Sequence, residues 1–270
     1  MMRFNVASAG LLVHLVGFVA CAADVTGSFV ETGSNIPLRQ APITVEVDGK
    51  DRQDLGTTTD DAGKFIIKNC PAGQVVLRFF KTDYVNYPTV RVVPTDGSPV
   101  DADARPKITD DYFKRILDAL HMQTQAGNAG AVSETWVKLK STMNAEEAVQ
   151  CAKLFAEKSP ELAAKAPEIA TFASVDTQKV KEFQAKVTSA EITPQKIPSL
   201  QSVAGQDLPK AVVGHAIADQ VLSRVHTADD LKTAELSIKR DLGEDYSAVT
   251  RASMVQLQKA NPGRYSLGNK

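Results

Sequence analysis

Histidine side chains are the first candidates for chemistry, because a neutral imidazole can bind a metal ion or accept a proton near pH 7. The chain carries four of them: His14, His121, His215 and His226. A zinc site built on a His-x-x-Glu pair is excluded, since none of the four is followed by glutamate at that spacing. His215 and Asp219 lie one helical turn apart, which favours a polar pair on a helix surface over a catalytic dyad. The sequence therefore predicts no catalytic residue and no metal ligand.

Thiols are the second kind of reactive group, and the chain has three cysteines: Cys21, Cys70 and Cys151. If Cys21 is removed with an export signal, the remaining two form an even pair, and a disulfide between them is one interpretation. The other is two buried thiols, because Cys70 ends a strand-like run and Cys151 shares an apolar helix side with Leu154 and Phe155. We favour the buried thiols, and the same apolar neighbours make Cys151 a poor nucleophile.

Other site patterns are weak or absent. Asp60 and Asp61 are adjacent carboxylates, but a calcium site needs several converging oxygens, so we interpret them as turn residues. Trp136 and Tyr112 are predicted core anchors; sugar stacking would need exposed aromatic side chains, and only 6% of the residues are aromatic. The sequence has no Gly-x-Ser-x-Gly elbow and no phosphate-binding glycine loop. No cofactor is predicted.

Composition limits the classes of protein that remain. The chain has 270 residues, 43% hydrophobic and 23% charged, which is ordinary globular usage and long enough for two domains. It carries 31 basic and 32 acidic residues, a net charge of -1. That balance argues against a nucleic-acid binder, which would show a basic excess or stripe.

The first residues resemble an export signal. An apolar run over residues 6–19 is followed by Ala-Cys-Ala at 20–22, a small-x-small cleavage site. We therefore predict that residues 1–22 are a signal peptide and that the protein is exported, to the periplasm or the extracellular space. The alternative is a membrane-anchored lipoprotein acylated on Cys21, but the bulky Phe18 fits a lipidation motif poorly.

Short alternating segments follow the signal. Apolar and polar residues alternate over 43–47, 65–68 and 74–79, which predicts strands with one buried face. Turn residues such as Asp48-Gly49 separate them. Short strands at this spacing predict a β sandwich, to which we assign residues 24–94.

The most specific part of this region is Thr-Thr-Asp-x-x-Gly-x-Phe at 58–65, followed by Pro-x-Gly at 71–73 and another strand. Residues 25–93 thereby resemble the carboxypeptidase regulatory-like domain, a transthyretin- or prealbumin-like sandwich that is also similar to Cna-B modules. The resemblance implies a module that positions or binds other molecules. Cys70 departs from the family, which usually has an aliphatic residue there. The absence of lysine from the first strand speaks against an internal isopeptide bond.

Helical periodicity begins at Thr109. Residues 95–108 are rich in Pro, Asp, Gly and Ala and are predicted to be a linker. Asn144 and Glu147 form a capping-box pattern, and similar signals divide residues 109–262 into a bundle-like all-α domain. The predicted fold is thus α+β with two domains, an all-β sandwich followed by a helical domain that resembles no family by its motifs.

These observations predict an exported, non-enzymatic cell-envelope protein with a binding or spacing sandwich and a helical partner-binding domain. The expected partner is an envelope protein or polysaccharide, with no nucleic acid, and with a membrane only if Cys21 is lipidated. One alternative is a hydrolase whose helical domain joins His215, Asp219 and His226 in a cleft. The other is a carbohydrate-binding protein, which would need an exposed aromatic row on the sandwich.

Overall fold

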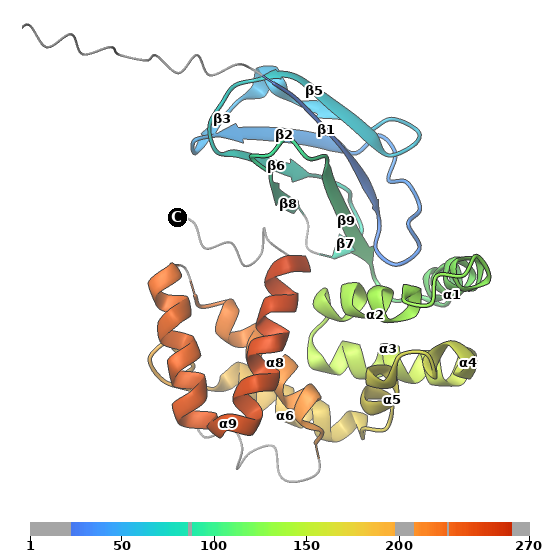
Figure 1. Ribbon diagram of the computed structural model, residues 1–270, viewed down its shortest axis with the longest axis vertical. Helices are drawn as coiled ribbons and strands as arrows, with labels where there is room; N and C mark the ends of the chain where they lie inside the picture. Colours follow the sequence, from blue (N-terminus) through green and yellow to red (C-terminus); the bar gives the residue numbers. More distant parts are fainter. Residues whose placement is uncertain (1–22, 86–87, 198–207, 226, 261–270) are drawn as a thin grey trace, which may run out of the picture.

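The computed structural model describes residues 23–85, 88–197, 208–225 and 227–260. Strands occupy the N-terminal part and helices the C-terminal part (Figure 1). The chain is therefore α+β, as predicted.

The strands form two sheets. The first has the order β5-β1-β9-β7, and the second has the order β3-β2-β6-β8, with β4 pairing to β2. All neighbours are antiparallel except β1 and β9, which run parallel. The strands of the first sheet are β1 (Ala23–Glu31), β5 (Lys64–Cys70), β7 (Tyr84–Val85) and β9 (Val100–Pro106); those of the second are β2 (Pro42–Val47), β3 (Lys50–Asp51), β4 (Thr57–Thr58), β6 (Val75–Phe79) and β8 (Thr89–Val92).

One apolar core is shared by the two sheets, because each strand turns alternate side chains inward. Phe79 of the second sheet meets Phe29 and Phe65 of the first, at ring-centroid distances of 5.0 and 5.3 Å. Such tilted aromatic contacts add to the free energy gained by burying the rings. We refer to this part of the chain as the β region.

Strand β9 corrects the predicted linker. Val100, Ala102 and Ala104 are buried, and β9 pairs with β1 from Gly27 opposite Val100 to Glu31 opposite Ala104. Alanine and aspartate have low strand propensity, so the segment does not look like a strand in isolation. Burial beside β1 overrides that preference. At Gly27 a β-carbon would lie 2.1 Å from the Val100 carbonyl oxygen, so only glycine allows the two strands to approach this closely.

The helices form a second apolar core. They are α1 (Asp110–Gln125), α2 (Ala131–Ser141), α3 (Ala145–Lys158), α4 (Pro160–Ala163), α5 (Pro167–Ala173), α6 (Thr177–Ser189), α8 (Lys210–Leu222) and α9 (Ala228–Ala260); a short 3-10 turn, η1 (Gln53–Leu55), lies in the β region. The predicted capping box is present, with Asn144 accepting from the Glu147 amide and Glu147 from the Asn144 amide. Gly243 breaks α9 with φ 76° and ψ 172°.

Candidate functional site

A polar joint connects the β region to the helices. Glu31 ends β1 and is 2% exposed. Its carboxylate accepts hydrogen bonds from Ser34 Oγ (2.6 Å), Tyr84 Oη (3.2 Å), and Arg115 Nε and Nη2 (3.1 and 2.9 Å). Burial, with a smaller contribution from Glu31, raises the pKa of Tyr84 to about 12, so the phenol keeps its proton. Glu31 therefore ties β1, β7 and α1 together through charge-assisted hydrogen bonds.

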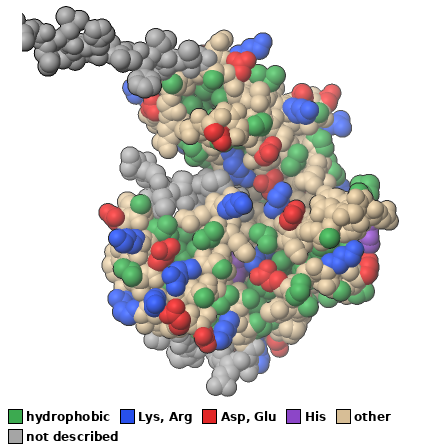
Figure 2. All heavy atoms as spheres, in the orientation of Figure 1, with side chains coloured by type: hydrophobic (Ala, Val, Ile, Leu, Met, Phe, Trp, Pro, Cys, Tyr) green, Lys and Arg blue, Asp and Glu red, His purple; other side chains and the backbone are tan. Residues whose placement is uncertain are grey.

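Arg105 of β9 makes the second charged contact of the joint, in which the strand supplies the base and the helix supplies the acid. Its side chain is 1% exposed, and its Nε donates to Thr142 Oγ1 at 2.8 Å. Its Nη2 donates to the Thr142 carbonyl at 3.1 Å and to Glu147 Oε2 at 3.3 Å. Tyr112 of α1 adds a hydrogen bond to the Thr32 carbonyl. Figure 2 shows basic and acidic side chains gathered on one face of this junction. Because each side supplies a charge that the other neutralises, the joint fixes how the two parts are oriented.

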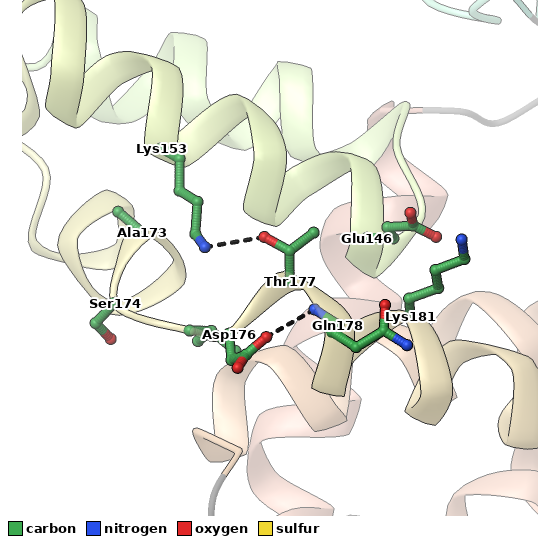
Figure 3. A pocket seen from close by; sticks show the side chains of 9 residues that line it. Glu146, Lys153, Ala173, Ser174, Asp176, Thr177, Gln178 and Lys181 are labelled. Atoms are coloured by element: carbon green, nitrogen blue, oxygen red, sulfur yellow. Dashed lines mark hydrogen bonds between the residues drawn. The ribbon is translucent and has the colours of Figure 1, made fainter.

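A hollow lies on the helical surface between α3 and the turn from α5 into α6 (Figure 3). Its volume is about 690 Å³. Lys153 Nζ donates to Thr177 Oγ1 at 2.9 Å, and Asp176 caps α6 by accepting from the Gln178 amide at 2.8 Å. Glu146 and Lys181 complete the charged lining. Two cations and two carboxylates suit polar partner groups better than an apolar ligand.

His215 and Asp219 do not form the predicted surface pair. They are 1% and 4% exposed, because α8 is apolar on most sides and lies inside the helical core. Burial, together with the charge of Lys140, lowers the pKa of His215 to about 4, so the imidazole is neutral at pH 7. Nε2 lies 2.9 Å from the Met143 carbonyl and therefore carries the hydrogen. His226 lies outside the described residues, so the cleft of the hydrolase alternative stays untested.

An ion pair with one buried member lies close to this histidine. Lys140 is 2% exposed, and its Nζ lies 2.6 Å from Glu168 Oε1. Trp136 is in the core as predicted, and its Nε1 donates to Glu168 Oε2 at 3.0 Å. Sequence reasoning missed Lys140, although it lies one turn after Trp136 on the same helix side. That spacing is the only local signal of its burial.

The cysteines lie in different cores. Cys70 belongs to the β core and Cys151 to the helical core, both as free, buried thiols, so they do not form the disulfide. Burial raises the pKa of Cys151 to about 12 and also raises that of Cys70, which keeps both protonated. Cys21, the alternative lipidation site, lies outside the described residues.

Asp60 stabilises the turn of the hairpin that precedes β5. Its Oδ1 accepts from the amides of Ala62 (2.9 Å) and Lys64 (2.8 Å), as expected for a turn residue. Within the described ranges, no group of three or more His, Cys, Asp or Glu side chains could hold a metal ion. Of the helices in the same ranges, none is both long enough and apolar enough to cross a membrane.

Comparison with known proteins leaves the family open. No protein-family model matches the chain, and no curated protein matches it. Among solved structures, it is similar to a streptococcal ancillary pilin, at 19% identity and a TM-score of 0.28, over 33% of this chain and 31% of the pilin chain. The chain thus spans about a third of that protein's length, and a TM-score this low supports no conclusion about fold or function.

Proposed function

We propose that this protein is exported to the periplasm or the extracellular space and acts there as a non-enzymatic binding protein of the cell envelope. Its β region is a prealbumin-like sandwich that serves as a spacing module. The helical domain carries the surface that binds a partner, an envelope protein or polysaccharide.

The observation that carries this proposal is the polar joint. Glu31 and Arg105 are almost fully buried, and each is paired with a side chain from the helices. The partners Arg115 and Glu147 are 40% and 43% exposed, so removing one member of either pair should cost about 2–3 kcal/mol, which is enough for the joint to resist bending. A spacing module needs such a connection, since a flexible one would not hold the helical surface in a fixed orientation.

The hollow between α3 and α6 is the surface that we assign to the partner. Lys181 is exposed, and Lys153 has a hydroxyl as its hydrogen-bond partner at 2.9 Å. Such groups exchange water for a partner's polar groups at a low desolvation cost. Helices α5 and α6, which help to line the hollow, lie on the side of the helical part away from the strands (Figure 1), so a partner could reach it while the sandwich is attached elsewhere.

Affinity capture from native envelope fractions tests the assignment. Lys181→Glu should reduce recovery of a specific protein or polysaccharide about tenfold, the effect of losing one charge-assisted contact. Lys186→Glu is the matched control, because Lys186 is also exposed on α6 but does not line the hollow. Equal recovery by both variants would show that the partner binds at another surface.

A hydrolase screen tests the other half of the proposal. We expect no turnover of peptide, ester or glycan substrates by the mature protein. If activity is found and a folded Asp219→Asn variant loses it, the hydrolase alternative replaces the binding protein.

A further inference from the structure

We propose that the groove between strand β7 and helix α3 binds the carboxylate of a small amphipathic ligand. The groove has a volume of about 310 Å³, near the lower end for small-molecule sites. Val85, Ile108 and Leu154 line it with apolar surface, and Arg105 and Lys107 line it with positive charge. It lies where the β region meets the helices, and such junctions are favoured places for ligand sites. The groove shares no lining residue with the hollow assigned to the envelope partner.

The two cationic side chains of the groove have hydrogen-bonding or ion-pairing groups that are not fully used within the protein. A guanidinium has five N–H donors. Arg105 Nε and Nη2 are used at 2.8 to 3.3 Å, whereas Nη1 has only a 3.4 Å contact to the Pro106 carbonyl. Lys107 is exposed, and no carboxylate in the described part of the chain lies within ion-pair distance of it. A ligand carboxylate could accept hydrogen bonds from the exposed Lys107, while Arg105, whose side chain is 1% exposed, contributes its positive charge from beneath the groove surface.

The net charge of the groove favours a single negative charge. Arg105 and Lys107 are positive and Glu147 is negative, which leaves one uncompensated positive charge. Glu147 Oε2 already accepts from Arg105 and from the Asn144 amide, yet the carboxylate still repels anions. Cys151 adds no charge, because burial keeps its thiol protonated. A monocarboxylate with an apolar body therefore fits better than a doubly charged phosphate.

Two kinds of ligand share this chemistry, a free fatty acid and the C-terminal residue of a peptide. Titration calorimetry on the mature protein with octanoate and with N-acetyl-leucine distinguishes them. Octanamide and N-acetyl-leucinamide are the matched neutral probes. We expect at least one carboxylate to bind about tenfold more tightly than its amide, because only the carboxylate makes charge-assisted hydrogen bonds. Equal binding of acid and amide, or no binding by either acid, would overturn the proposal.

Three variants locate the site. Lys107→Gln should weaken carboxylate binding about tenfold, whereas Lys114→Gln, an exposed lysine outside the groove, should leave it unchanged. Glu147→Gln should tighten binding about threefold, since a repulsive charge is removed while an acceptor is kept. Leu154→Gln should weaken acid and amide alike through the lost apolar contact. Carboxylate binding that is indifferent to Lys107 and Glu147, with circular dichroism showing folded variants, would place the ligand elsewhere.

Discussion

The β region and the helical region bury polar side chains in different places. The β core is built on Phe29, Phe65 and Phe79, and the buried charges among its described residues, Glu31 and Arg105, lie at the joint. The helical core contains ionisable groups in its interior, among them Lys140 and His215. The β region should therefore depend on packing and turn geometry, while the helical region should also depend on the protonation state of its interior.

The largest effect is expected from the ion pair of the buried Lys140 with Glu168. Glu168→Met leaves the Lys140 ammonium, 2% exposed, without a carboxylate, and should lower the free energy of unfolding by about 4 kcal/mol. Glu46→Met is the counterpart in the β region, where the partner Arg78 is 38% exposed, and should cost less than about 1 kcal/mol. Urea unfolding of both variants measures the difference.

A double variant checks the cause of that loss. Lys140→Met combined with Glu168→Met removes both charges and should recover most of the stability, because no unpaired charge remains buried. A double variant as unstable as Glu168→Met alone would show that packing or the lost hydrogen bond from Trp136, and not charge, is responsible.

Acidification should weaken the helical region selectively. The pKa of His215 is about 4 in the folded protein and 6.5 in a model peptide, so between these values only the unfolded chain binds the proton. The free energy of unfolding should have its full value above pH 6.5 and should fall by about 3 kcal/mol as the pH drops to 4. His215→Gln should flatten this part of the urea-unfolding pH profile, whereas His121→Gln, at a partly exposed position, should not. Identical profiles for the two variants would contradict the assignment.

Weakening the joint should uncouple the unfolding of the β region from that of the helical region. Arg105→Met removes the bonds to Thr142 and Glu147 and should cost about 2–3 kcal/mol. We expect near- and far-UV circular dichroism to melt together in the parent protein and apart in the variant. Coincident transitions in the variant would mean that the joint does not couple the regions.

The smallest expected effect is in the hairpin before β5. Gly63 has φ 70°, and a β-carbon there would lie 2.6 Å from the Phe29 carbonyl oxygen. Gly63→Ala should therefore lower the free energy of unfolding by about 2 kcal/mol, against less than about 0.5 kcal/mol for the exposed Lys64→Ala. Equal melting temperatures would show that this turn is not strained by a side chain.

Local patterns predicted much of the fold and little of the candidate site. Alternation identified strands such as β2 and β6, and capping residues such as Asn144 marked helix starts, because both signals lie within a few neighbouring residues. Strand β9 was missed, since its stability comes from β1, more than 70 residues away. His215 was misplaced because its spacing to Asp219 suggests a surface pair, while the apolar residues around them on α8 determine burial. The bond between Glu31 and Arg115 spans 84 residues, so no local pattern reveals it.

The parallel pairing of β1 with β9 has a mechanical consequence. Tension entering at Ala23 and leaving through Pro106 toward α1 would pull these two strands in opposite directions along their length. The five registered pairs from Gly27–Val100 to Glu31–Ala104 would then be loaded together, in shear, instead of opening one after another. If the protein is held at its N-terminal end and pulled through its helical domain, the force therefore acts on the β1–β9 hydrogen bonds. Loaded together in shear, these bonds resist separation better than bonds that open one at a time.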